Sequence, residues 1–214
     1  MPGPSATMQQ TFAKGASMRK RSFSDMTLEE AMPLVAAERF IAWQIHAPAR
    51  PPSDILAANL RRLRRFDTVS TEAAKLLLID TLLAECIEAY EHLKVWKGEA
   101  LVSATLTGFA DYLITPDYAF VKAPLLCAAE AKRDDFKQGR AQCVGELAAC
   151  REKNAAAKFD IDLFGFVSNG QIWQFYKLTT ENEIFETAEY TTLYLPELLG
   201  ALDYICAECA KRVP

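Results

Sequence analysis

Three ionisable side chains near the middle of the chain have the types and spacing that metal-assisted hydrolysis of a phosphate ester needs. Glu130 and Lys132 end a run, residues 125–132, that is otherwise apolar. Positions two apart on a strand share one face, so both side chains project together. Asp111 interrupts the preceding apolar run. If the two runs form a hairpin, Asp111 faces Glu130, and two carboxylates with backbone and water oxygens suit Mg²⁺ or Mn²⁺.

The alternative for an isolated Glu-x-Lys is an ordinary salt bridge at a strand end. A charged pair at the end of a buried strand is costly unless it is paired or bound, and Asp111 supplies a further acidic partner. Pro116-Asp117 lies in the expected turn, well away from Glu130 along the strand, so Asp117 is interpreted as a turn residue rather than a ligand. The combination favours a site built from Asp111, Glu130 and Lys132.

The elements that must position these residues follow from the apolar pattern between residue 93 and the C-terminus. We expect three consecutive antiparallel strands, a helix, a hairpin around Ser168–Gln171, a last strand and a helix after Pro196. The expected bounds are strands 93–104, 106–114 and 120–131, helix 136–154, strands 160–168 and 172–178, and strand 184–190.

The residues before 93 differ in character. The first 24 are rich in Ser, Gly, Pro and Gln without apolar periodicity, which predicts a flexible arm. Residues 25–91 are predicted to be helical. The capping box Thr27-Leu-Glu-Glu30 opens one helix to about His46, and two more run over about 54–66 and 71–91. We therefore expect one α/β domain, residues 25–214, with a mixed sheet flanked by helices, a core of about 70–180, and a C-terminal strand and helix over 183–212.

Several short motifs together resemble a known family. They are Thr107-Gly-Phe-Ala-Asp111-Tyr, Glu130-Ala-Lys132, Gln142, Phe164-Gly-Phe-Val-Ser-Asn-Gly170 and Trp173-Gln-Phe-Tyr176. Over roughly residues 70–180 the chain is similar to the PD-(D/E)XK nuclease superfamily, and within it to the N-terminal nuclease-like domain of type I restriction enzyme R subunits. The resemblance implies a restriction-endonuclease-like sheet and Mg²⁺ or Mn²⁺ as the cofactor.

The resemblance also implies roles for individual residues. Asp111 and Glu130 would hold metal, Lys132 would orient or activate the attacking water, Glu72 would complete the metal shell, and Gln142 matches a family glutamine. Glu72 could instead only stabilise a helix start, and Gln142 could be an exposed helical glutamine. The aromatic residue that the family carries three or four positions after its glutamine is missing, and Glu146 stands near that place.

Composition and charge limit the classes of protein. A net charge of −4 and a pI near 5.4 do not indicate a strongly basic nucleic-acid binder, although cations cluster locally. One group is Arg61, Arg62, Arg64 and Arg65; the other is Lys132, Arg133, Lys137, Arg140, Arg151, Lys153 and Lys158. Either group could receive phosphates or be a solvated helix face. Without a signal-peptide run or about 18 consecutive apolar residues, we expect a cytoplasmic protein with no membrane partner.

Six cysteines sit mostly in apolar helix or strand patterns, which predicts buried, unpaired thiols. Cys206-Ala-Glu-Cys209 is a lone C-x-x-C, without the second ligand pair that a zinc site needs. Trp173, Phe175 and Tyr176 are interpreted as strand packing rather than base-stacking residues.

Two functions fit the pattern. The first is Mg²⁺-dependent hydrolysis of nucleic-acid phosphodiesters, with DNA the favoured substrate, in a site open to solvent. The second is a non-catalytic nucleic-acid- or protein-binding module that keeps the nuclease fold within a defence or repair complex. An intact Asp-Glu-Lys set favours the first, because clustered charge is costly without a use. The sequence leaves three questions open. They are whether the protein forms a homodimer or larger complex, whether the substrate is DNA or RNA, and whether cleavage is endonucleolytic or exonucleolytic.

Overall fold

The computed structural model describes residues 20–68, 70–131 and 135–213, apart from the side chains of residues 72 and 73. The helical elements of this part are α1 (Leu28–Ala31), the 3₁₀ turn η1 (Met32–Val35), α2 (Asp54–Leu63), α3 (Glu72–Ile87), α4 (Phe136–Ala156), the 3₁₀ turn η2 (Thr192–Tyr194) and α5 (Leu195–Ala210). The strands are β1 (Arg21–Ser22), β2 (Ile41–Trp43), β3 (Leu93–Val102), β4 (Leu106–Pro116), β5 (Cys127–Ala131), β6 (Leu163–Ser168), β7 (Ile172–Leu178), β8 (Ile184–Thr187) and β9 (Tyr190–Thr191).

The described strands form one mixed sheet of nine, in the order β1-β4-β5-β6-β7-β8-β2, with β3 on β4 and β9 on β7. The pairs β3–β4, β4–β5, β6–β7 and β7–β8 are antiparallel. The pairs β5–β6 and β8–β2 are parallel. The long helix α4 connects β5 to its parallel neighbour β6, as a parallel pair requires. The chain is therefore an α/β protein with a mixed sheet flanked by helices.

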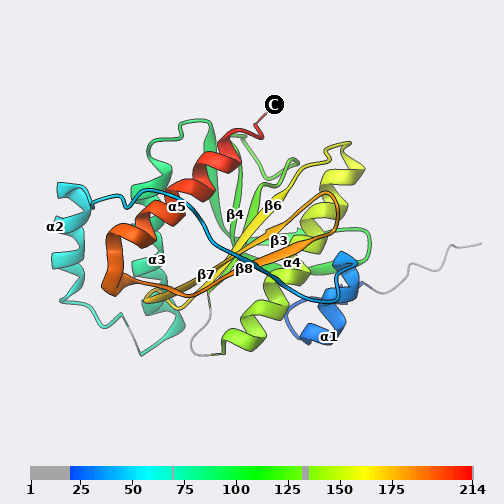
Figure 1. Cartoon of the computed structure of the whole chain (residues 1–214), viewed down its shortest axis with the longest axis horizontal. Helices are drawn as coiled ribbons and strands as arrows, with labels where there is room; N and C mark the ends of the chain where they lie inside the picture. Colours follow the sequence, from blue (N-terminus) through cyan, green and yellow to red (C-terminus); the bar gives the residue numbers. More distant parts are fainter. Residues whose placement is uncertain (1–19, 69, 132–134, 214) are drawn as a thin grey trace, which may run out of the picture.

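The helices divide between the two faces of the sheet (Figure 1). One core cluster holds side chains of α3, α5 and the strands, among them Ile79, Leu202 and Trp173. The other holds side chains of α1, η1 and α4, among them Phe23, Val35 and Leu147. Residues 141–150 of α4 are all buried. This helix is therefore covered both by the sheet and by the N-terminal segment.

Local sequence explains where the helices begin. Side chains of Ser53, Thr71 and Asp135 accept hydrogen bonds from backbone N–H groups in the first turns of α2, α3 and α4. The Glu30 carboxylate accepts from the Thr27 N–H at 3.0 Å, which is one half of the predicted capping box. The predicted second and third helices are confirmed with ends about three or four residues early, and the expected antiparallel meander, α4, hairpin and α5 are also present.

The predicted helix from Thr27 to His46 is wrong beyond its first turns. Ala36 adopts φ +54°, a left-handed conformation that ends the helical path. The chain then extends, and Ile41–Trp43 pairs in parallel with β8. Backbone pairing at the sheet edge overrides an apolar spacing that fits a helix. The region 25–91 is therefore helical only in part.

Two further boundaries differ from the prediction. The arm was expected to reach residue 24, but Arg21–Ser22 pairs with β4 and Phe23 is completely buried. Phe23 packs where Gly108 has no side chain, since a Cβ there would lie 2.4 Å from the Phe23 ring. The third strand begins at Cys127 rather than 120, and Phe120 is exposed. Residues 1–19 of the predicted arm lie outside the described residues.

Candidate active site

Asp111 and Glu130 meet where β4 separates from β5. The last hydrogen-bonded pairs of these strands are Ile114 with Cys127, Leu113 with Ala128, and Tyr112 with Ala129. The same register carried one residue further sets Asp111 opposite Glu130. The Ala131 N–H donates to Asp111 Oδ2 at 2.7 Å, which ties the Asp111 carboxylate to the end of β5. The two acidic residues singled out by the sequence are thus neighbours.

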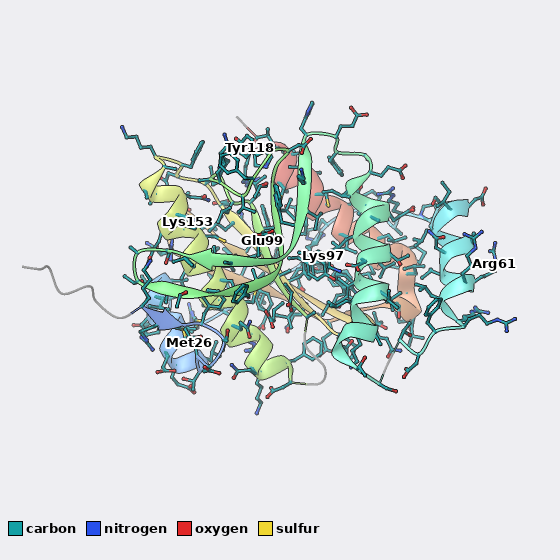
Figure 2. The ribbon with its side chains drawn as sticks, turned by 180° about the vertical axis from the view of Figure 1, so that it is seen from behind. Met26, Arg61, Lys97, Glu99, Tyr118 and Lys153 are labelled. Carbon is teal, nitrogen blue, oxygen red and sulfur yellow. The ribbon has the colours of Figure 1, made fainter. Side chains whose placement is uncertain are left out.

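On the other side of β4, the strand β3 bends at the position opposite Asp111. Lys97 pairs with Tyr112 and Glu99 with Ala110, so Gly98 lies between these pairs, with φ +63°. Such a backbone conformation favours glycine, and it lets the long hairpin twist away from the central strands. Figure 2 shows Lys97 and Glu99 on this part of β3. β4 pairs with β5 only from Tyr112 to Ile114, and Asp111, just before this stretch, is only partly buried.

Glu130 is more enclosed than the sequence indicated. Its exposed fraction is 3%, so the prediction of a carboxylate pair open to solvent is wrong for this residue. The Gln142 side chain of α4 covers it, and its Nε2 donates to Glu130 Oε2 at 2.6 Å. Gln142 is itself 5% exposed and is therefore not an exposed helical glutamine. A strand-end acid held by a helix amide has a fixed orientation.

Glu146 is a third acidic residue at this position, and sequence reasoning did not place it there. It lies one helical turn after Gln142 on α4, is 0% exposed, and its Oε1 is 3.5 Å from Gln142 Nε2. Burial raises the pKa of Glu146 well above its usual range. The charge of Glu130, a hydrogen bond with Glu130 and the charge of Asp111 add to this rise, whereas the Gln142 amide opposes it. The sequence feature that could have revealed this position is an acidic residue within the apolar stretch 144–147, four positions after Gln142.

The raised pKa of Glu146 predicts a pH-dependent stability. Below the ordinary value of 4.5 the carboxyl is protonated in both the folded and the unfolded state, so it costs nothing. Above that pH the unfolded chain ionises first, and folding stability falls until the pH passes the folded pKa. We expect Glu146→Gln to remove this loss and to stabilise the protein by about 1–2 kcal/mol at pH 7 but not at pH 4. Urea unfolding at both pH values measures the difference; a pH-independent effect would contradict it.

The remaining predicted site residues are only partly described. Lys132 lies outside the described residues, together with Arg133 and Asp134. Glu72 begins α3, but its side chain also lies outside the described part. Asp117 follows β4, makes an ion pair with Lys94 at 3.4 Å, and is six residues, or about 20 Å of strand, from Asp111. Asp117 is thus engaged at the other end of β4.

The Arg61 group lies on and just after α2, whereas the described members of the other basic group lie on or just after α4. Figure 2 shows Arg61 on α2 and Lys153 on α4, with the sheet between them. Arg140 pairs with Glu186 at 3.0 Å and packs over the Phe40 ring, so part of its charge is compensated. The Arg61 group is separate from α4 and its acidic residues.

All six cysteines are buried, free thiols, which confirms the prediction. Burial raises the pKa of Cys143, and the charges of Glu146 and Glu130 raise it further. Burial likewise raises the pKa of Cys209 to about 12. Thiols that stay protonated are poor nucleophiles, so neither residue is suited to act as one. Trp173, Phe175 and Tyr176 are fully buried, which confirms that they pack within the protein.

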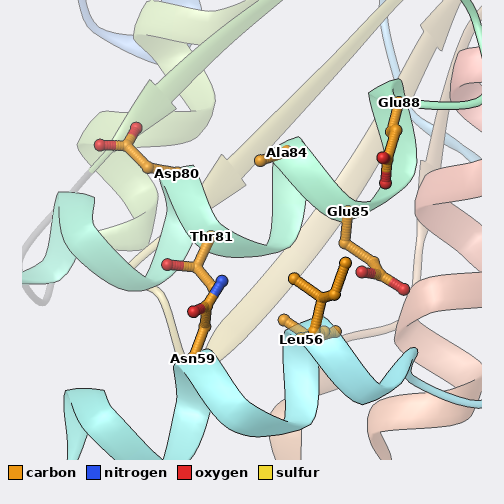
Figure 3. A pocket seen from close by; sticks show the side chains of 8 residues that line it. Leu56, Asn59, Asp80, Thr81, Ala84, Glu85 and Glu88 are labelled. Carbon is orange, nitrogen blue, oxygen red and sulfur yellow. The ribbon is translucent and has the colours of Figure 1, made fainter.

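A separate concave region lies between α2 and α3 (Figure 3), with a volume of about 480 Å³. Two of its three acidic lining residues, Glu85 and Asp80, have partners in the protein. Glu85 accepts from the Ser53 N–H and hydroxyl, at 3.0 and 2.7 Å. Asp80 accepts from the Tyr112 hydroxyl at 2.8 Å and pairs with Lys97 at 2.6 Å. The Glu85 contacts join α3 to the start of α2, and the Asp80 contacts join α3 to β4 and β3, so both residues have a structural role.

The sequence matches no protein-family model, and no curated protein matches it either. Among the helices of the described ranges, none has the length and apolar character needed to cross a membrane.

The donor chemistry at β5 fits a hard divalent cation. Within the described residues, no three or more His, Cys, Asp or Glu side chains are arranged to hold a metal ion. Mg²⁺ does not need such a cage, because it commonly takes one or two carboxylates and keeps several waters. Asp111 and Glu130 supply that number of carboxylates, and unpartnered buried oxygens on α4 lie beside Glu130.

Proposed function

We propose that this chain is a metal-dependent nuclease of the PD-(D/E)XK type, with a restriction-endonuclease-like fold, that hydrolyses phosphodiester bonds of nucleic acid. DNA is the favoured substrate. The observation that carries the proposal is the contact between Asp111, in the middle of β4, and the end of β5, which carries Glu130. Asp111 is tied to Ala131 by a 2.7 Å hydrogen bond, and Glu130 is the residue before Ala131.

The order of elements around this contact supports the proposal. The helix α3 precedes the antiparallel strands β3, β4 and β5, and α4 then leads to β6, which is parallel to β5. The acidic residues lie at the end of β5 from which the chain leaves the sheet for α4, and ligand sites in α/β sheets favour such ends. This arrangement agrees with the motif order that the sequence shares with the nuclease family.

Each residue has a distinct role in this proposal. Asp111 and Glu130 would hold Mg²⁺ or Mn²⁺, with Glu72 as a further candidate ligand. When bound, the cation would supply Lewis-acid activation of water and would stabilise charge on the phosphate. Lys132 would orient the attacking water and donate to the phosphate oxygen on which charge develops. Gln142 fixes the Glu130 carboxylate through its 2.6 Å hydrogen bond.

The proposal is tested by incubating the pure protein with linear, circular and single-stranded DNA in the presence of Mg²⁺, Mn²⁺ or EDTA. We expect cleavage that needs the cation, and loss of cleavage in Lys132→Ala, because a cation at the phosphate has been removed. Cleavage of circular DNA would indicate an endonuclease. Equal cleavage by wild type and Lys132→Ala would exclude this lysine from the reaction and point to a contaminating nuclease.

The burial of Glu130 favours a second candidate function, a non-catalytic binding module that keeps the nuclease fold. An acid at 3% exposure and bonded to Gln142 has limited access to a phosphodiester. If the protein binds nucleic acid, with or without the cation, and never cleaves it, this second function replaces the first. Gel-shift and cleavage assays on the same samples separate the two.

A further inference from the structure

Two side-chain oxygens on α4 have no hydrogen-bond partner within the described part of the chain. They are Gln142 Oε1 and Glu146 Oε2, and each atom is essentially inaccessible. The residues are 5% and 0% exposed. Buried polar atoms in folded proteins nearly always have a partner, and an unpartnered one signals a missing water, ion or ligand. Gln142 Oε1 is an acceptor, and Glu146 Oε2 accepts whenever its carboxyl is ionised, so a species with hydrogen-bond donors or positive charge would satisfy both oxygens.

These oxygens belong to the surroundings of Glu130. The single Gln142 amide nitrogen lies 2.6 Å from Glu130 Oε2 and 3.5 Å from Glu146 Oε1, so it joins the strand acid to the helix acid. Asp111 is close enough for its charge to act on Glu146. Three carboxyl groups and one amide oxygen therefore gather at the end of β5, where Glu130, Gln142 and Glu146 are buried and Asp111 is partly exposed.

A hydrated divalent cation would supply the hydrogen-bond donors and the positive charge that these oxygens need. Mg²⁺ keeps several of its waters when one or two carboxylates bind it, and those waters donate hydrogen bonds. Acceptors in the layer beyond the ligands orient the bound groups and strengthen binding. With no three-ligand group among the described residues, Glu146 is better placed to receive such waters than to ligate directly beside both other acids.

We infer that Glu146 and Gln142 are positioning residues of the cation site, accepting hydrogen bonds from the waters of a divalent cation held by Asp111 and Glu130. The inference rests on the proposed function. It adds the α4 side chains that set the affinity of the site for the cation.

The test is Mn²⁺ affinity, measured by electron paramagnetic resonance of free Mn²⁺ with no nucleic acid present. We expect Glu146→Gln to weaken Mn²⁺ binding roughly 10-fold, within the range for residues that support metal ligands. Glu146→Asp keeps a carboxyl group and should recover part of the affinity. The matched control is Glu152→Gln, an acid-to-amide change on the same helix, where Glu152 accepts from the Thr105 N–H at 3.0 Å. It should bind Mn²⁺ as the wild type does.

The outcomes separate this inference from the proposed function. If Asp111→Asn and Glu130→Gln abolish Mn²⁺ binding while Glu146→Gln binds like wild type, the role of Glu146 is refuted and the two-carboxylate site stands. If the wild type binds no Mn²⁺, both fall. Circular dichroism first establishes that each variant folds. Should Glu146→Gln not fold, Gln142→Leu takes its place and must also weaken binding if the inference is correct.

Discussion

Glu130→Gln should reduce the rate of metal-dependent DNA cleavage by about 10³-fold, or about 4 kcal/mol of transition-state stabilisation. The substitution keeps the size of the side chain but replaces the carboxylate proposed to bind the cation with a neutral amide. The fold should persist, because Gln142 can still bond to an amide oxygen at the position of Glu130 Oε2. Single-turnover cleavage at saturating Mg²⁺ isolates the chemical step from substrate binding.

The matched control for Glu130→Gln is Glu88→Gln, which removes the same charge from the exposed C-terminal end of α3. This variant should cleave at the wild-type rate. If both variants lose activity to the same extent, the effect reflects total charge and not the ligand position. If Glu130→Gln keeps more than about a tenth of the wild-type rate, Glu130 does not bind a catalytic cation.

Trp173→Ala should lower the free energy of unfolding by about 3–5 kcal/mol, the usual cost of removing a large core side chain. The Trp173 ring is fully buried, with its centroid 5.1 Å from that of Phe166 and 6.4 Å from that of Phe175. Its indole N–H also donates to the Gly170 carbonyl at 3.0 Å, which stabilises the β6–β7 turn. Urea unfolding measures the loss.

Leu193→Ala is the corresponding surface control, since Leu193 is 87% exposed and should change stability by no more than about 0.5 kcal/mol. A loss below about 1 kcal/mol in Trp173→Ala would mean that this aromatic cluster is not part of a tightly packed core.

Much of the fold was predictable because local signals and tertiary contacts agree. Helix starts at Ser53, Thr71 and Asp135 carry capping side chains, and the turn at Ser168–Gln171 lies between two strands of matched length. The predictions fail where the structure depends on contacts between residues far apart in the sequence. Nothing local in Ile41–Trp43 indicates β8 as its partner, and Phe23 is buried where Gly108 and Gly145 leave room for it.

The candidate site was likewise predictable in part. Asp111 and Glu130 could be paired from the sequence, because each interrupts an apolar run on one of two consecutive strands and the apolar pattern of such strands sets their register. The burial of Glu130 and the position of Glu146 beside it could not be predicted from the sequence, because both depend on how α4 packs across the sheet. Ten consecutive buried residues on α4, 141–150, exceed what one amphipathic face would bury. The cause is the N-terminal segment, which covers the outer side of that helix.

The central claim, that Asp111 and Glu130 bind a divalent cation, is tested most directly by thermal melting with and without millimolar Mg²⁺ or Mn²⁺. A ligand that binds only the folded state at ten times its Kd adds about 1.4 kcal/mol, which is roughly 3–6 °C for a chain of this size. We expect that rise in the wild type, and little or none in Asp111→Asn and Glu130→Gln. Equal stabilisation of all three proteins by metal would contradict the two-carboxylate site.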